Sequence, residues 1–180
     1  VELAATFEIN FFKYSLVKSR DTKKWTPYIF MGGSLFYYNP YTYLDGVKYK
    51  LESVGTEGQK TANKPTKNKG YDQYAFAIPY GLGVKIGLTQ NWAINVEASS
   101  RITFTDYIDD VSSYYVDKNV LLAAKGPKSV EMAYRGGQSP VGSPLYPAHG
   151  EQRGTPSEMD WYYFFGLTTE IRINALSQLF

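Results

Sequence analysis

Four aspartates within twelve residues form the densest group of chemically capable side chains: Asp106, Asp109, Asp110 and Asp117. Gathered carboxylates can bind calcium, but this spacing lacks the glycine and the terminal glutamate of an EF-hand loop. Aspartate also favours turns, so solvated, turn-forming aspartates are the simpler interpretation. We therefore predict no metal ligands here and keep calcium as the alternative.

Catalytic arrangements have little support. The single histidine, His149, stands in a loop rich in proline and glycine, and no nucleophile motif accompanies it. The glycine pairs at 32–33 and 136–137 lack the flanking pattern of a phosphate-binding loop. The chain has no cysteine, which excludes disulfides and thiolate metal sites. We predict a protein that is not an enzyme and has no cofactor and no small-molecule substrate.

Six charged residues fall on the polar faces of the strands predicted below. They are Glu8, Lys85, Glu97, Arg101, Glu170 and Arg172. If they point into a narrow lumen they must pair, because an isolated buried charge is very costly. We expect a structural salt-bridge network in which Glu97 and Arg101 pair with charges from neighbouring strands, among them those at 85, 170 or 172. A conducting or proton-relay path is the minor alternative.

Five long stretches position these charges: 3–14, 27–38, 74–87, 92–105 and 161–173. They alternate with the period of two that is typical of β-strands. Each is longer than the roughly five or six residues usual in soluble sheets, and a tilted membrane strand needs about 9–11. The last three have one large, apolar face and one small, polar or charged face. Both faces of 27–38 are apolar, so its orientation stays open.

A soluble β-sandwich would alternate too, with its apolar face inward. Two details favour the inverted arrangement of a membrane barrel. The polar faces are rich in glycine, alanine, serine and threonine, and aromatic residues gather at strand ends, as in the girdles at lipid interfaces. We assign Trp25, Trp92 and Trp161 to these interfaces. The composition agrees, since aromatics make up 17% of the chain. The net charge of +2 gives no strong field for nucleic acid.

The connections alternate between short and long. Residues 18–25 and 87–91 are short turns, whereas 39–73 and 106–160 are long, polar and expected to lack regular structure, apart from a helical turn or two at 119–125. Short periplasmic turns and long extracellular loops are typical of outer-membrane barrels. We predict an all-β, antiparallel transmembrane barrel, with residues 1–180 as one domain in the outer membrane. Such barrels have an even number of strands, at least eight, so we expect three further strands upstream of these five.

The turn between 74–87 and 92–105 allows a sharper prediction. Both strands put their apolar residues at even positions, and directly paired residues of an antiparallel ladder share a face. The numbers of two paired residues must therefore add up to an even number, which requires a loop with an odd number of residues. We favour a three-residue loop at 89–91 that pairs Leu88 with Trp92 and Gly83 with Glu97. Asn91 is the expected left-handed residue, since asparagine tolerates that conformation.

Several segments carry a family resemblance. They are Phe7-Glu8-Ile9-Asn10-Phe11-Phe12, Thr26-Pro27-Tyr28-Ile29-Phe30, Gly55-Thr56-Glu57-Gly58-Gln59, Thr103-Phe104-Thr105-Asp106-Tyr107-Ile108-Asp109-Asp110-Val111-Ser112 with Tyr115-Val116-Asp117, and Asp160-Trp161-Tyr162 with Gly166-Leu167. Together they resemble the PorG-type outer-membrane proteins of the Bacteroidota type IX secretion system. The resemblance implies a longer N-terminus with a signal peptide and extra strands. It offers no catalytic residues.

The same resemblance implies a non-enzymatic component of a protein secretion machine. Its expected partners are outer-membrane lipids and a periplasmic ring built from a lipoprotein and its companion, PorK and PorN. Our leading hypothesis is a barrel that anchors or contacts that ring. The alternative is a small porin or adhesin-like barrel acting through its extracellular loops.

Overall fold

The computed structural model of the 180-residue chain describes residues 1–17, 20–61 and 70–171. These residues divide into two compact units. Among the described residues, the sheet unit consists of 2–17, 20–35, 76–103 and 161–171, and the loop unit of residue 1 with 36–61, 70–75 and 104–160.

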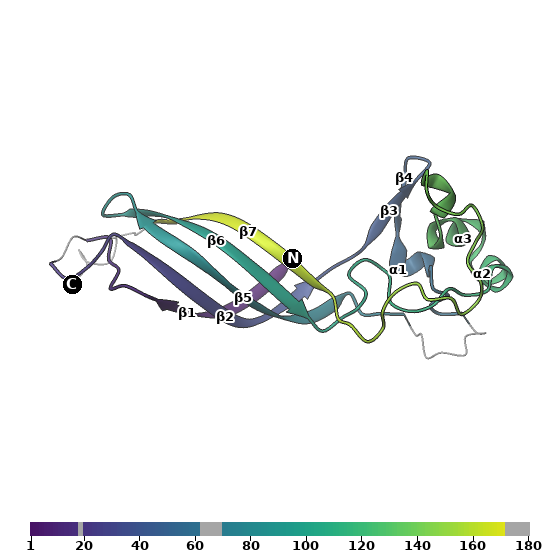
Figure 1. The fold of residues 1–180 in the computed structure, drawn as a ribbon, viewed down its shortest axis with the longest axis horizontal. Coiled ribbons are helices and arrows are strands. Elements are labelled where there is room, and N and C mark those ends of the chain that lie inside the picture. Colours follow the sequence, from purple (N-terminus) through teal and green to yellow (C-terminus); the bar gives the residue numbers. More distant parts are fainter. Residues whose placement is uncertain (18–19, 62–69, 172–180) are drawn as a thin grey trace, which may run out of the picture. The chain divides into compact units, whose positions relative to one another are not determined.

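Five long strands form one sheet in the order β1-β2-β5-β6-β7 (Figure 1). The strands are β1 (Glu2–Asn10), β2 (Trp25–Tyr37), β5 (Tyr74–Gly87), β6 (Trp92–Thr103) and β7 (Trp161–Ile171). They match the five predicted stretches to within a few residues, and the all-β, antiparallel prediction is confirmed. Among the described residues β1 and β7 each have one neighbour, so the sheet is open.

The two faces of the sheet have opposite polarity. One face, which we call the covered face, carries the even-numbered residues of β1, β2 and β7 and the odd-numbered residues of β5 and β6, and it is mainly small, polar or charged. It is buried mainly on β2, β5 and β6, whereas every residue of β1 is exposed. The exposed face is apolar; Phe7 and Phe165, for example, are 86% and 81% exposed. This sheet is therefore inverted relative to a water-soluble one. The orientation of β2, which the sequence leaves open, is also resolved, since Tyr28 and Phe30 are buried on the covered face while Ile29 and Met31 are exposed.

Two glycines let aromatic rings lie flat on the covered face. A Cβ at Gly81 would stand 2.8 Å from the ring of Phe30, and one at Gly83 would stand 2.5 Å from Cζ of Tyr28. Contacts this short do not occur between real side chains and a Cβ atom, so only glycine fits beneath these rings. The aromatic residues of β2 are thus accommodated on a face that is otherwise small and polar.

The hairpin between β5 and β6 has the predicted register. Gly83 pairs with Glu97 and Ile86 with Ile94, which corresponds to the three-residue loop. The Leu88 amide donates to the Trp92 carbonyl at 2.9 Å, which closes the turn. The predicted left-handed conformation of Asn91 is wrong, because this residue has no positive φ. Instead its amide donates to the Thr89 hydroxyl at 3.2 Å, so a side-chain hydrogen bond shapes the turn.

The loop unit contains regular structure, so the expectation that residues 39–73 and 106–160 lack it is wrong. The elements are the hairpin β3 (Tyr41–Leu44) and β4 (Val47–Lys50), the helices α1 (Leu51–Val54), α2 (Lys118–Lys125) and α3 (Pro127–Ala133), and the 3-10 turn η1 (Gly136–Gln138). The predicted helical turns at 119–125 are confirmed by α2. A small core of Val116, Leu121 and Ala133 holds its helices together. No helix in the described part of the chain is long and apolar enough to span a membrane.

Candidate functional site

The covered face of the sheet brings some of the predicted charges together. Lys85 Nζ on β5 lies 2.5 Å from the Glu8 carboxylate on β1. Arg101 on β6 lies 3.4 Å from the carboxylate of Glu2 on β1, and Tyr162 on β7 donates to the same carboxylate at 3.4 Å. Side chains of the first strand therefore reach those of the last two, which requires a strongly curved sheet with the covered face inside.

Glu97 and Arg101 lie on the covered face as predicted, but within the described residues Lys85 pairs with Glu8 and Arg101 with Glu2, and the third predicted partner, Arg172, lies outside these residues. Glu97 accepts a hydrogen bond from the Tyr28 hydroxyl at 3.1 Å, and the Tyr28 ring occupies the space above Gly83, the residue that pairs with Glu97. Arg101 instead reaches Glu2, which the analysis of the sequence missed. The sequence contained a signal for Glu2, since Glu2 and Glu8 are both even-numbered residues of the same strand and therefore lie on the same face.

Two predicted members of the network remain apart from these pairs. Glu170 is exposed on β7, where it pairs in register with Ala93. Arg172 lies outside the described residues. The three assigned tryptophans begin strands: Trp25 opens β2, Trp92 opens β6 and Trp161 opens β7, and all are partly exposed on the apolar face.

A second constellation lies within the loop unit, around a fully buried glutamate. Glu57, with 0% of its surface exposed, accepts hydrogen bonds from the backbone amides of Ser112 and Ser113 at 2.9 and 3.0 Å. The Ser113 hydroxyl donates to its second oxygen at 2.7 Å. Arg153 Nη1 completes the set at 3.1 Å. This carboxylate therefore joins three segments that are far apart in the sequence.

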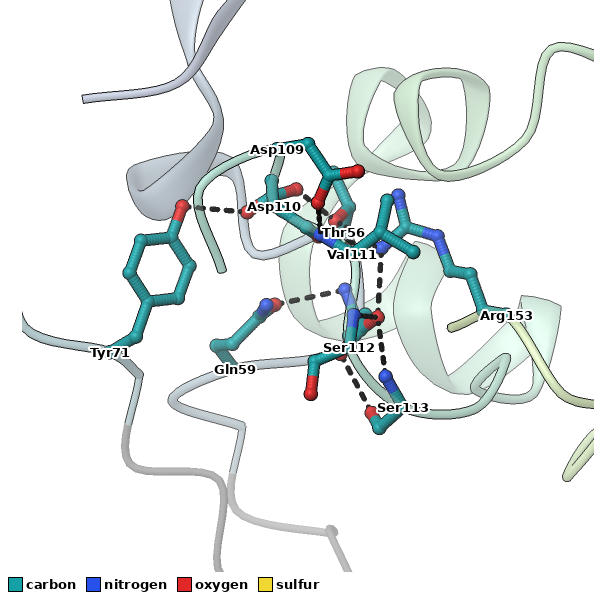
Figure 2. A network of polar contacts seen from close by, with 10 residues as sticks. Thr56, Gln59, Tyr71, Asp109, Asp110, Val111, Ser112, Ser113 and Arg153 are labelled. Carbon is teal, nitrogen blue, oxygen red and sulfur yellow. Dashed lines mark hydrogen bonds and ion pairs between the residues drawn. The ribbon is translucent and has the colours of Figure 1, made fainter. Parts of the chain in front are cut away.

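Asp110 is the second buried carboxylate of this network, which Figure 2 shows from close by. It accepts hydrogen bonds from the hydroxyls of Thr56 and, at 2.8 Å, Tyr71. Arg153 Nη1 donates to the Asp110 backbone carbonyl and to Thr56 Oγ1, both at 3.0 Å. We call Thr56, Glu57, Tyr71, Asp110 and Arg153, with the donors at 112–113, the carboxylate clasp.

The surroundings of Asp110 in the clasp raise the pKa of its carboxyl group. The pKa of Asp110 is raised to about 6, chiefly by burial and in smaller part by the nearby Glu57 carboxylate, while the hydrogen bonds from Thr56 and Tyr71 and the Arg153 charge oppose this shift. Burial and the Asp110 charge also raise the pKa of the Tyr71 phenol. Arg153 pairs with the Glu57 carboxylate and also lies close enough to Asp110 to lower its pKa, so one positive charge acts on two buried carboxyl groups.

Three stacked tyrosines adjoin the clasp. The Tyr71 ring stacks on Tyr107 with 4.6 Å between centroids and on Tyr38 with 6.0 Å, and the planes differ by 14° and 9°. Tyr38 also shares a hydrogen bond of 3.0 Å with Thr105. Tyr38 lies just after β2, Tyr71 just before β5 and Tyr107 just after β6. The stack therefore connects positions at which the long loop segments begin or end.

The remaining aspartates have local structural roles. Asp117 caps α2 by accepting from the amides of Asn119 and Val120 at 2.8 and 3.1 Å, and Asp109 accepts from the Val111 amide at 3.0 Å. Burial raises the pKa of Asp106. Within the described ranges no group of three or more metal-ligating side chains is arranged to hold an ion. His149 is exposed in its loop.

The clasp was not predicted from the sequence. Its segment 55–59 stood out only through the family resemblance. Asp110 stood out as a member of the aspartate cluster but was interpreted as a solvated, turn-forming residue, and Arg153 was not singled out. No local sequence pattern reveals that Glu57 contacts the backbone at 112–113, since these residues lie 55 and 56 positions after Glu57 in the chain.

Comparison with known proteins gives one match. A family described as "Domain of unknown function (DUF6089)" matches residues 1–121, which include β1 to β6 and the start of α2. No curated protein matches, and no solved structure matches.

Proposed function

The chain belongs to the DUF6089 family, and we propose that it is a membrane-spanning β-barrel protein of the outer membrane that serves a secretion machine without catalysing a reaction. The observation that supports the proposed membrane location is the inverted polarity of the five-stranded sheet. A sheet in water exposes polar side chains and buries apolar ones, whereas a barrel in lipid does the reverse.

The covered face supports the same proposal. Four of its charges pair across strands, Glu8 with Lys85 and Glu2 with Arg101, and Glu97 accepts a hydrogen bond from Tyr28. A narrow barrel has its interior filled by side chains, and charges there must be compensated. In this proposal the covered face lines the lumen and the paired charges form a structural plug.

The strand edges set a further condition. In hydrocarbon every backbone amide and carbonyl needs a partner, so an open sheet edge does not persist there. The outer edges of β1 and β7 must then pair with further strands to close the barrel. Three more strands would give the eight of a small outer-membrane barrel.

The role in secretion rests on the resemblance to PorG-type proteins. We propose that the barrel anchors or contacts a periplasmic ring of the PorK and PorN kind. A second candidate function, a porin or an adhesin-like barrel, is favoured by one observation: the long connections form an ordered unit with its own core and buried clasp. An ordered loop unit is a suitable platform for binding a partner outside the cell.

A pair of substitutions on neighbouring residues of β7 tests the membrane proposal. Leu167 lies on the exposed face, and Thr168 on the opposite face, where it pairs with Asn95. Leu167→Arg should prevent insertion, because arginine in the lipid-facing middle of a barrel costs about 2–4 kcal/mol. Thr168→Arg should be tolerated, because Thr168 is exposed on the polar face and acidic residues of that face, Glu97 and Glu170, lie on neighbouring positions. The measurement is the yield of native protein in urea-washed outer membranes; a protein whose exposed face meets water would show normal Leu167→Arg abundance and would refute the proposal.

Purification in mild detergent separates the two functional candidates. A ring component should bring its ring proteins with it in a stable ratio. Purification of the protein alone, together with discrete conductance steps in a planar bilayer, would support the porin instead.

A further inference from the structure

We propose that the exposed face of the sheet carries a binding groove for one ester-linked acyl chain of a membrane lipid, in which the Ser100 hydroxyl donates a hydrogen bond to the ester carbonyl. This inference rests on the proposed membrane location and adds a specific lipid ligand to it.

The groove is a hollow of about 720 Å³ on the apolar face. In the strand register Tyr80, Ser100 and Tyr163 form one transverse row, and the next row is formed by Leu82, Ala98 and Phe165. All of them line the hollow, and β1 and β2 extend its walls with Phe7, Ile9, Ile29 and Met31. Sites for small ligands typically measure about 300–1,000 Å³, so one hydrocarbon chain fits this size.

Ser100 distinguishes this groove from an ordinary lipid-facing surface. It is only 6% exposed, although it lies on the exposed face, because Tyr80 and Tyr163 flank it on both neighbouring strands. Its Oγ has no hydrogen-bond partner within the described structure. A buried hydroxyl without a partner is unfavourable, so a ligand that supplies an acceptor would be favoured.

A polar atom is also what selectivity in a bilayer requires. Lipid tails are as apolar as leucine, so apolar contacts alone give a bound chain little advantage over the surrounding lipid. No charged residue is among those that line the hollow, so it does not select a headgroup. A peptide would bring many more backbone polar groups than one hydroxyl can satisfy. An acyl chain with a single carbonyl matches this lining.

The position of Ser100 along its strand matches the depth at which lipid ester carbonyls lie in a bilayer. Ser100 pairs with Tyr163, two residues from the interface residue Trp161. At about 3.3 Å per residue this is roughly 7 Å along the strand, and less along the membrane normal once the strand tilts. Ester carbonyls of membrane lipids occupy this boundary between headgroup and hydrocarbon. The chain below the carbonyl would then continue past Ala98 and Leu82.

The test compares two phosphatidylcholines that differ only in their linkage. The native full-length protein is placed in lipid nanodiscs that contain equal amounts of the ester-linked and the ether-linked lipid, and the lipid retained after release is identified by native mass spectrometry. Because an ether has no carbonyl, we expect the ester lipid to be retained about three- to fivefold more, the effect of one hydrogen bond in a membrane. Ser100→Ala should remove this preference. Ala98→Phe, which fills the groove, should lower retention of both lipids.

Thr169→Val is the matched control, since Thr169 lies exposed on the same face of β7, pairs with Ile94 and does not line the hollow. It should leave the ester preference unchanged. Equal retention of the two lipids by the wild-type protein, or an unchanged preference in Ser100→Ala, overturns the groove while the membrane location stands. A wild-type protein that does not enter nanodiscs at all overturns the membrane proposal instead.

Discussion

Replacement of Arg153 by methionine tests whether the carboxylate clasp holds the loop unit in its fold. Methionine keeps much of the volume of the arginine side chain but removes its charge and donors. Arg153 is 8% exposed and its partner Glu57 is completely buried, so the change leaves a buried carboxylate without its cation. It also removes the donor to the Asp110 carbonyl.

The expected cost follows from this burial. Removal of one member of a buried ion pair typically costs about 3–5 kcal/mol. Glu57 keeps its hydrogen bonds from residues 112–113, so we expect the lower end, about 3 kcal/mol. Every 1.4 kcal/mol is a factor of ten, so the open population of the loop unit should rise about a hundredfold.

Hydrogen exchange measures this change directly. The amides of Ser112 and Ser113 donate to Glu57 and should exchange about a hundred times faster in Arg153→Met, while the amides of β5 and β6 stay protected. Lys118→Met removes the same charge from an exposed position of α2 and serves as the control. Exchange in Arg153→Met within threefold of this control would refute the assignment of the clasp as the structural centre of the loop unit.

Three further predictions concern other parts of the chain. The pKa of Asp110 is raised to about 6, above its unfolded value near 3.9, so its contribution to stability is fully present below pH 4 and is lost as pH rises through 6. Exchange protection of the loop unit should therefore fall by about 2 kcal/mol more between pH 4 and 7 in the wild type than in Asp110→Asn; equal pH profiles would contradict this. Gly83→Ala should lower the thermal unfolding midpoint in detergent, because its Cβ would meet the Tyr28 ring, and Tyr28→Leu should restore it; additive losses would argue against this contact. His149→Ala and Asp109→Asn should leave secretion intact at normal barrel abundance, and a complete secretion defect would count against a non-catalytic role.

The strands of the sheet could be predicted because their information is local. Alternation with a period of two marks each strand, and the parity of its apolar positions fixes which residues can pair. The register of Gly83 with Glu97 therefore followed from residue numbers alone. The orientation of β2 could not be predicted in this way, because Tyr28 and Phe30 are large but lie on the polar face. Glycines on the neighbouring strand β5 leave room for their rings.

The loop unit could not be predicted because its order depends on distant residues. Glu57 meets the backbone 55 positions later, and Arg153 is 96 positions from Glu57. Such contacts leave no periodic signal, and the segments between them are rich in turn-forming residues. Only α2 has a local signal, the cap at Asp117 and the stop at Gly126. The hydrogen bond from Tyr28 to Glu97 was missed for a similar reason, since these two residues are 69 positions apart.

The odd length of the β5–β6 turn has an evolutionary consequence. Loss or gain of one residue between Leu88 and Trp92 would change the parity of every pair in this hairpin and exchange the two faces of one strand. Loss or gain of two residues would preserve the faces. Length variation at this turn among relatives should therefore occur in steps of two, or in single steps accompanied by a β-bulge that restores the parity.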